Sequence, residues 1–224
     1  MSTVHDLHAV APPADGTLAR FPAEPYPSAG SYFDGYAIET ARGVASIDPV
    51  ALNQAADILL AAYTGGARVF SCGNGGSAAI ANHLQCDHVK GVATSTDLRP
   101  RVVSLSASIE LLTAIANDMS YEDVFAYQLA AQASAGDVLI AISSSGRSPN
   151  IVRALTWAHD HDLATIALTG FGGGDARAVA DVAVHVDCAN YGIVEDLHQA
   201  VMHALAQYLR QSRMTADMIT ASVF

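Results

Sequence analysis

The stretch Asp137-Val138-Leu139-Ile140-Ala141-Ile142-Ser143-Ser144-Ser145-Gly146-Arg147-Ser148 is a continuous apolar run that passes directly into a serine-rich loop. An apolar run of this length without polar alternation is typical of a strand buried on both faces of a parallel sheet. Pro149 then begins a segment with helical periodicity, in the first-turn position that proline favours. We therefore expect a strand, a hydroxyl-rich turn and a helix in succession.

Short apolar runs and helical segments alternate on both sides of this stretch. The sequence predicts strands over 68–72, 101–105, 137–142, 164–168 and 182–186. It predicts helices over 31–65 with a break near Asp48-Pro49, from 77 to about Lys90, and over 109–116, 121–133, 149–159, 175–180 and 193–213. Strands that alternate with helices indicate an α/β fold, here a three-layer αβα sandwich with a five-stranded parallel sheet of the flavodoxin-like kind.

The chain of 224 residues shows no break in composition, which favours a single folded domain. We expect this domain over 31–213, preceded by a loose, proline-rich arm over 1–30 and followed by a short tail over 214–224. Ligands of open parallel sheets lie at the carboxyl ends of the strands. The loops that follow the first and third predicted strands are therefore the candidate binding loops.

The overall charge narrows the choice of partners and compartment. Eleven basic and 22 acidic side chains give a net charge of -11, which argues against a nucleic-acid partner. The three cysteines have no paired spacing, and this favours a reducing compartment. Residues 1–13 do not resemble a secretory signal, and no run approaches the ~18 apolar residues of a membrane helix. We expect a cytoplasmic protein without membrane association.

The serine loop is a candidate phosphate site. Four hydroxyl side chains cluster just before a helix, where unpaired backbone N–H groups and a partial positive charge favour an anion. The alternative is that one serine caps the helix and the others only fill the loop. The density of hydroxyls favours phosphate binding, and the four residues concerned are Ser143, Ser144, Ser145 and Ser148.

Gly73-Asn74-Gly75-Gly76-Ser77 forms a second candidate loop, after the first predicted strand. Its glycines allow a close backbone approach to a ligand, and Asn74 and Ser77 can bond ligand hydroxyls. The spacing fits neither the dinucleotide fingerprint nor a Walker loop, so we expect no nucleotide cofactor. An ordinary strand-to-helix turn remains the alternative.

Two helices carry acid–base residues on one face. His83 and Asp87 are four residues apart, and Glu195, Gln199 and His203 follow the same spacing on the last helix. A carboxylate and a histidine suit general acid–base chemistry or zinc binding, although exposed polar pairs are the simpler alternative. Glu195 and His203 lie roughly 12 Å apart along a straight helix. Reaching one metal would need extended side chains, a distorted turn or residues from different copies.

Four motifs together resemble the SIS-domain phosphoheptose isomerases over about residues 40–212. They are Gly-Asn-Gly-Gly-Ser at 73–77, Leu-Thr-Ala-Ile-Ala-Asn-Asp at 112–118, Gly136 with the adjoining strand and serine loop over 137–148, and Leu-Thr-Gly at 168–170. The resemblance implies an aldose–ketose isomerase that converts sedoheptulose 7-phosphate to D-glycero-D-manno-heptose 7-phosphate through an enediol. It also implies a homotetramer with active sites between subunits, and one Zn²⁺ per active site.

The resemblance also implies individual roles. Asp87 and His203 would be the catalytic pair, with Asp87 as the base and His203 handling protons on oxygen, or with these two roles reversed. The substrate-binding residues would be Asn74, Gly75, Ser77, Asp118, Ser143, Ser144, Ser145, Ser148 and Glu195. The metal ligands would be His83, Asp87, Glu195 and His203.

The chain departs from the family pattern at a few positions. Asp87 stands where the family has glutamate, and Glu195 stands where it has glutamine. Gly192 replaces an aspartate that touches the sugar, and Gly91 lies near the place of an arginine. These changes leave two alternatives, a non-catalytic SIS-domain adaptor or regulator and an isomerase of another sugar phosphate such as arabinose 5-phosphate. Retention of Asp87 and His203 favours an enzyme.

Overall fold

The computed structural model describes residues 20–223. Most of the expected N-terminal arm, residues 1–19, lies outside the described residues, as does Phe224. The described end of the arm packs against the first helix. Phe21 is buried, and its ring centroid lies 5.1 Å from that of Tyr32 and 5.7 Å from that of Tyr26.

The predicted order of helices and strands is confirmed. The five strands are β1 Arg68–Gly73, β2 Arg101–Ser104, β3 Val138–Ser143, β4 Ala164–Thr169 and β5 Val182–His185. The helices are α1 Ala29–Ser46, α2 Pro49–Gly65, α3 Gly76–Cys86, η2 Asp87–Val92, α4 Ile109–Asp118, η3 Tyr121–Asp123, α5 Ala126–Gln132, α6 Pro149–Asp160, α7 Gly174–Val179, α8 Tyr191–Gln211 and α9 Ala216–Thr220. The predicted break at Asp48-Pro49 separates α1 from α2, with Asp48 as the N-cap of α2.

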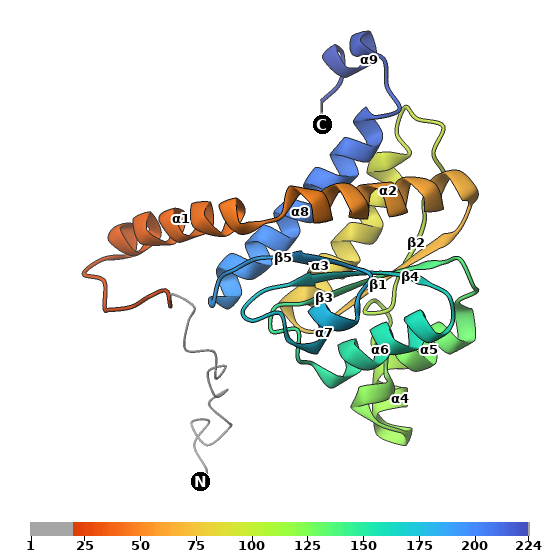
Figure 1. Cartoon of the computed structure of the whole chain (residues 1–224), viewed down its shortest axis with the longest axis horizontal. Coiled ribbons are helices and arrows are strands. Elements are labelled where there is room, and N and C mark those ends of the chain that lie inside the picture. Colours follow the sequence, from red (N-terminus) through yellow and green to blue (C-terminus); the bar gives the residue numbers. More distant parts are fainter. Residues whose placement is uncertain (1–19, 224) are drawn as a thin grey trace.

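The strands form one parallel sheet in the order β2-β1-β3-β4-β5, as the flavodoxin-like prediction requires. Helices cover both faces of the sheet, and α1 extends away from the body of the molecule (Figure 1). The chain order reverses next to β1, so β1 and β3 are neighbours. The loops that follow these two strands therefore open side by side at one edge of the sheet.

Two hydrophobic cores fill the space between the sheet and its helices, and the alternation of side chains along β3 separates them. Val138, Ile140 and Ile142 face the core shared with α2, α3 and α8. Leu139 and Ala141 face the core shared with α4, α5, α6 and α7. Burying an aliphatic side chain of this size stabilises the fold by about 1.5–3 kcal/mol, so the apolar run of β3 anchors the sheet to both helical layers.

The structure departs from the predicted elements where local hydrogen bonding changes. The helix expected to run to Lys90 is α-helical only to Cys86 and continues as the π-helix η2 from Asp87. The single helix expected over 121–133 is divided into the 3₁₀ turn η3 and the α-helix α5. Helix α9 lies in the tail, where the sequence predicted no element. None of the helices among residues 20–223 is both long and apolar enough to cross a membrane.

Candidate functional site

The serine loop and the glycine loop line one small cavity of about 140 Å³ at the edge of the sheet. The cavity lies at the carboxyl ends of β1 and β3, against the first turns of α8. Its lining residues are Asn74, Ser77, Ile142, Ser143, Ser144, Ser145, Ser148, Tyr191 and Glu195. Six of the predicted substrate-binding residues, together with Glu195, are thus brought together from three separate elements.

The hydroxyls of the serine loop divide into bonded and available groups. Ser143 Oγ accepts a hydrogen bond from the Gly146 N–H at 3.1 Å, which shapes the turn. Ser144 Oγ is buried and has no partner within the described part of the chain. Ser148 occupies the N-cap of α6, but its side chain does not cap the helix. Two hydroxyls and the N-terminus of a 12-residue helix are therefore available to an anion.

Glycine is required at the centre of the serine loop. Gly146 has a φ of 65°, and a Cβ there would lie 1.8 Å from the Gly173 carbonyl oxygen. In the other loop, Gly75 has a φ of 54° and forms the N-cap of α3. Both positions are in the left-handed region that glycine tolerates without strain. The glycines therefore allow both loops to bring their backbones to the cavity.

Glu195 closes the cavity from α8. Its carboxylate lies directly over Gly76, where even a methyl group would clash with Oε2. Burial, with a smaller contribution from the charge of Asp196, raises the pKa of the Glu195 carboxyl above its ordinary value. The carboxylate that was predicted to join a metal site thus lies beside the cavity lined by the serine loop.

Two of the predicted substrate-binding residues do not line the cavity, namely Gly75, at the N-cap of α3, and Asp118. Asp118 is exposed at the end of α4, where its Oδ1 accepts a hydrogen bond from the Asn117 amide at 2.8 Å. Conversely, the cavity includes Tyr191, the first residue of α8, which the sequence did not single out. Its position after the N-cap Asn190 carries no motif that would have identified it.

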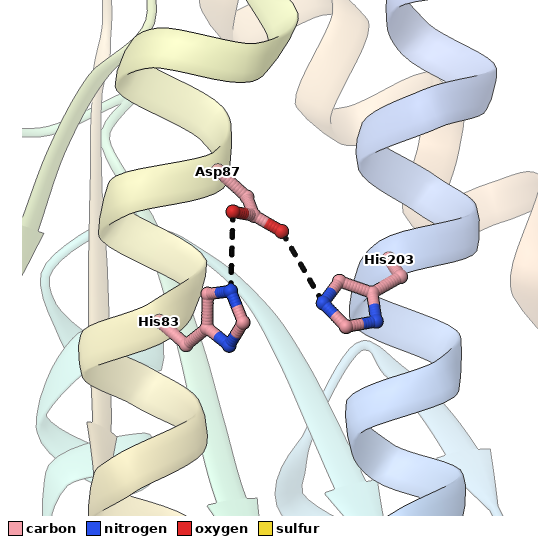
Figure 2. A group of neighbouring side chains, drawn as sticks. All are labelled: His83, Asp87 and His203. Carbon is pink, nitrogen blue, oxygen red and sulfur yellow. Dashed lines mark ion pairs between the residues drawn. The ribbon is translucent and has the colours of Figure 1, made fainter. Parts of the chain in front are cut away.

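A second cluster joins η2, α3 and α8. His83 Nε2 lies 3.2 Å from Asp87 Oδ1, and His203 Nε2 lies 3.4 Å from Asp87 Oδ2. Figure 2 shows the Asp87 carboxylate between the two imidazole rings, with His83 and Asp87 on one helical segment and His203 on the facing helix. A single chain therefore assembles the acid–base pair that the sequence predicted, and no second copy is needed to bring these three side chains together.

The donor set of this cluster fits a metal ion. One ligand atom from each of His83, Asp87 and His203 lies within 4.8 Å of the others, and two imidazole nitrogens with a carboxylate oxygen suit zinc. Gln199 Nε2 lies 3.0 Å from His203 Nε2. Because an amide nitrogen only donates, His203 Nε2 accepts this bond through its one lone pair, so Gln199 would have to release this nitrogen before it could bind a metal. Glu195 is not part of this cluster.

The π-helix η2 begins at Asp87, and its wider turn sets the direction of the following residues. His88 points into the core, where its Nδ1 lies 2.5 Å from the Tyr63 hydroxyl oxygen. Burial lowers the pKa of His88 to about 4 and raises the pKa of Tyr63. Both groups are therefore neutral at pH 7, and the Tyr63 hydroxyl donates to the imidazole.

The cavity and the cluster lie along the same helix. Glu195 lines the cavity, and His203 follows it by eight residues, roughly 12 Å farther along α8. Larger hollows elsewhere lack this combination. The one of about 560 Å³ has Asp137 as its one charged lining residue, and this carboxylate accepts hydrogen bonds from the Arg68 and Ser134 N–H groups.

Comparison with known proteins identifies the family of this chain. A sequence model of the SIS domain matches residues 32–170. A phosphoheptose isomerase of Colwellia psychrerythraea is 35% identical over 175 residues, which cover 77% of this chain and 89% of the relative. One from Nitratidesulfovibrio vulgaris is 39% identical over 140 residues, covering 62% and 67%. The solved phosphoheptose isomerase of Neisseria gonorrhoeae superposes with a TM-score of 0.74 at 31% identity, covering 81% of this chain and 96% of that one.

Proposed function

Because this chain belongs to the SIS-domain family and, within it, to the phosphoheptose isomerases, it is a sugar-phosphate isomerase, and we propose which of its residues perform the reaction. The reaction converts sedoheptulose 7-phosphate to D-glycero-D-manno-heptose 7-phosphate. The observation that carries the assignment of roles is the placement of a hydroxyl-lined cavity and an Asp–His cluster along one helix.

The cavity would hold the phosphate group. The free hydroxyls of Ser144 and Ser148 and the N-terminus of α6 supply donors for its oxygens. Holding one end of an open-chain sugar limits the positions of its other end, so the carbonyl carbons would be presented to the cluster farther along α8. Asp118 is proposed to bond a sugar hydroxyl only on the strength of the family motif, since it lies outside the cavity.

The Asp87 carboxylate and the His203 imidazole would move the protons. In the ketose-to-aldose direction, Asp87 removes a proton from C1, next to the C2 carbonyl, and the electron pair forms the C1–C2 double bond of an enediol. His203 transfers the proton between O1 and O2. The proton then returns to C2 as the C1 carbonyl forms, so atoms and electrons balance without an oxidant. The two side chains could exchange these roles, because both face the same space.

We also propose that Zn²⁺ binds at His83, Asp87 and His203, with Glu195 as the predicted fourth ligand. A bound zinc ion would polarise the substrate carbonyl and stabilise the enediolate. Glu195 would have to leave its position over Gly76 to join it. The measurement that checks metal binding is the zinc content per chain by atomic emission after dialysis, which should fall in Asp87→Asn and stay unchanged in Asp97→Asn.

We propose a cytoplasmic homotetramer with its active sites at subunit interfaces. Three free cysteines among the described residues are compatible with a reducing compartment. The helix α1 supports self-association, since Phe33, Ile38 and Val44 on it are each more than half exposed. The non-catalytic adaptor is the weaker candidate, because an adaptor has no need of the assembled Asp87–His203 pair.

The direct test is turnover of sedoheptulose 7-phosphate by the purified full-length protein, followed by NMR with and without added zinc. We expect product with the wild type and a loss of at least about 10²-fold in His203→Ala, the usual contribution of an acid–base group. His161→Ala is the matched control, because this exposed histidine stacks on Trp157 away from the site. A fully active His203→Ala would contradict the assigned role, and a wild type without turnover would contradict the function.

A further inference from the structure

Two amides join the two loops that line the cavity. Asn74 Nδ2 donates to Asn150 Oδ1 at 2.9 Å, and Asn150 Nδ2 donates back to Asn74 Oδ1 at 2.9 Å. Asn74 belongs to the glycine loop after β1, and Asn150 is the second residue of α6, directly after the serine loop. Two hydrogen bonds in opposite directions fix the orientation of both amide planes, so this pair links the glycine loop to the serine loop.

A tyrosine completes the bonding of Asn74. The Tyr121 hydroxyl, from the turn η3, donates to Asn74 Oδ1 at 2.9 Å. Asn74 Oδ1 therefore accepts two hydrogen bonds, which is its full capacity, and Nδ2 uses one of its two N–H groups on Asn150. The amide is left with a single N–H donor, and Asn74 lines the cavity. It can thus offer a ligand one donor and no acceptor.

Asn150 does not line the cavity itself but contacts a residue that does. It is only 2% exposed, it is not among the residues that line the cavity, and both of its side-chain hydrogen bonds go to Asn74. A buried amide is costly unless its polar atoms are paired. Asn74 provides both hydrogen bonds of the Asn150 side chain. The two amides can therefore change orientation only together.

We propose that Asn150 and Tyr121 are positioning residues of the isomerase. They hold the Asn74 amide so that its remaining N–H points at an acceptor oxygen of the phosphosugar, and Asn150 fixes the spacing of the two binding loops. This inference rests on the proposed function. It predicts that a sugar phosphate meets a preset donor at Asn74, so the site favours an oxygen without a proton at that position.

The test uses Tyr121→Phe, which removes one hydroxyl from a side chain that is 59% exposed. The loss of one hydrogen bond to Asn74 should raise the KM for sedoheptulose 7-phosphate about 3- to 10-fold. The kcat should stay within about twofold of the wild type, because Asn74 lies at the cavity and away from the Asp87–His203 cluster. Tyr127→Phe is the matched control, since Tyr127 is 48% exposed and its hydroxyl has no hydrogen bond within residues 20–223.

A double-mutant cycle distinguishes positioning from a purely structural role. If Tyr121 acts through Asn74, Tyr121→Phe should have no further effect on KM in an Asn74→Ala background. Asn150→Ala should show the same dependence on Asn74, and Asn150→Asp, which keeps the acceptor for Asn74 Nδ2, should recover part of the loss. Additive effects, or a Tyr121→Phe variant with the kinetics of Tyr127→Phe, would overturn the proposal even if Asn150→Ala did not fold.

Calorimetry with sedoheptulose 7-phosphate and with inorganic phosphate separates this inference from the proposed function. A wild type that binds the sugar phosphate without turning it over would contradict the proposed function. Weaker binding by Tyr121→Phe would still support the positioning role in that case. If the wild type bound neither probe, both proposals would be overturned. Weaker binding of the sugar phosphate alone would place the Asn74 donor on the sugar, and weaker binding of both probes would place it on the phosphate.

Discussion

At the residue scale, the most informative side chain is Ser144. Its hydroxyl is buried at the carboxyl end of β3 and has no partner within the described residues, whereas the neighbouring Ser143 hydroxyl is bonded to the Gly146 N–H. A buried, unpaired hydroxyl costs about 1–3 kcal/mol relative to a satisfied one. In the free protein this cost opposes folding, and a bound phosphate would remove it.

Replacing each serine by alanine should therefore have opposite effects. We expect Ser144→Ala to leave the free energy of unfolding of the ligand-free protein unchanged or raise it by up to ~1 kcal/mol, while KM rises about tenfold. Ser143→Ala should lower the free energy of unfolding by about 0.5 kcal/mol, because the Gly146 N–H loses one of its two acceptors and keeps the Ser143 carbonyl oxygen. Urea denaturation and steady-state kinetics measure both. Equal destabilisation by the two variants would contradict this account of Ser144.

At the scale of the element, the π-helix η2 decides where the Asp87 carboxylate, the proposed base, lies. Asp87 is its first residue, and His88 anchors it to α2 through the buried Tyr63 hydroxyl. His88 Nε2 has no partner within residues 20–223, so Tyr63 supplies the one hydrogen bond that the buried imidazole makes. Asp87 is adjacent in the chain and is held in place by the same turn.

Tyr63→Phe should destabilise the protein by about 1–3 kcal/mol, because the His88 Nδ1 acceptor would then be buried without a donor. The ring still fills its place in the core, so the loss reflects the hydrogen bond and not a cavity. Chemical denaturation gives the value, with Tyr208→Phe on the exposed side of α8 as the control. If both variants were equally stable, the anchoring role of this bond would be refuted.

At the scale of the whole molecule, buried histidines link stability to pH. His198 on α8 is fully buried, and burial lowers its pKa to about 4. The unfolded chain, with an ordinary pKa near 6.5, takes up a proton more readily, so folded-state stability is complete above pH ~6.5 and is lost as the pH falls toward 4. The loss from this one group approaches ~1.4 kcal/mol per pH unit within that window.

His198→Leu should make the free energy of unfolding less dependent on pH in the acid range. The difference in slope corresponds to one proton taken up on unfolding. The measurement is the free energy of unfolding of both proteins at several values between pH 7.5 and pH 4.5. The free energy of unfolding of the variant should rise relative to that of the wild type as the pH decreases. Parallel curves would show that His198 stays unprotonated in the unfolded chain or is charged in the core.

The extended helix α1 sets the expected assembly. Phe33 is 68% exposed and Ile38 57% exposed, on a helix that projects from the rest of the chain (Figure 1). We expect Phe33→Glu with Ile38→Glu to shift sedimentation toward smaller species, because charges on two sides of this helix would oppose its burial against a second copy. Met218→Glu in α9 is the control. Unchanged sedimentation of the double variant would exclude burial of Phe33 and Ile38 between copies of the chain.

The sequence alone determined the fold and located the two loops that line the cavity. Apolar runs, glycines and hydroxyls are local signals, since strand burial, positive φ and helix N-termini depend on a few neighbouring residues. The helices that carry His83, Asp87 and His203 were also predicted from local periodicity. The types of these side chains indicated acid–base or zinc chemistry.

Only the tertiary structure decided which of these residues meet. It placed the Asp87 carboxylate between two imidazoles of one chain, and it put Glu195 at the hydroxyl-lined cavity and Asp118 outside it. It also paired Asn74 with Asn150 across 76 positions in the chain. Such contacts depend on how the helices pack against the sheet and on the change to a π-helix at Asp87. Side-chain packing between distant parts of the chain determines both, so no local sequence pattern predicts them.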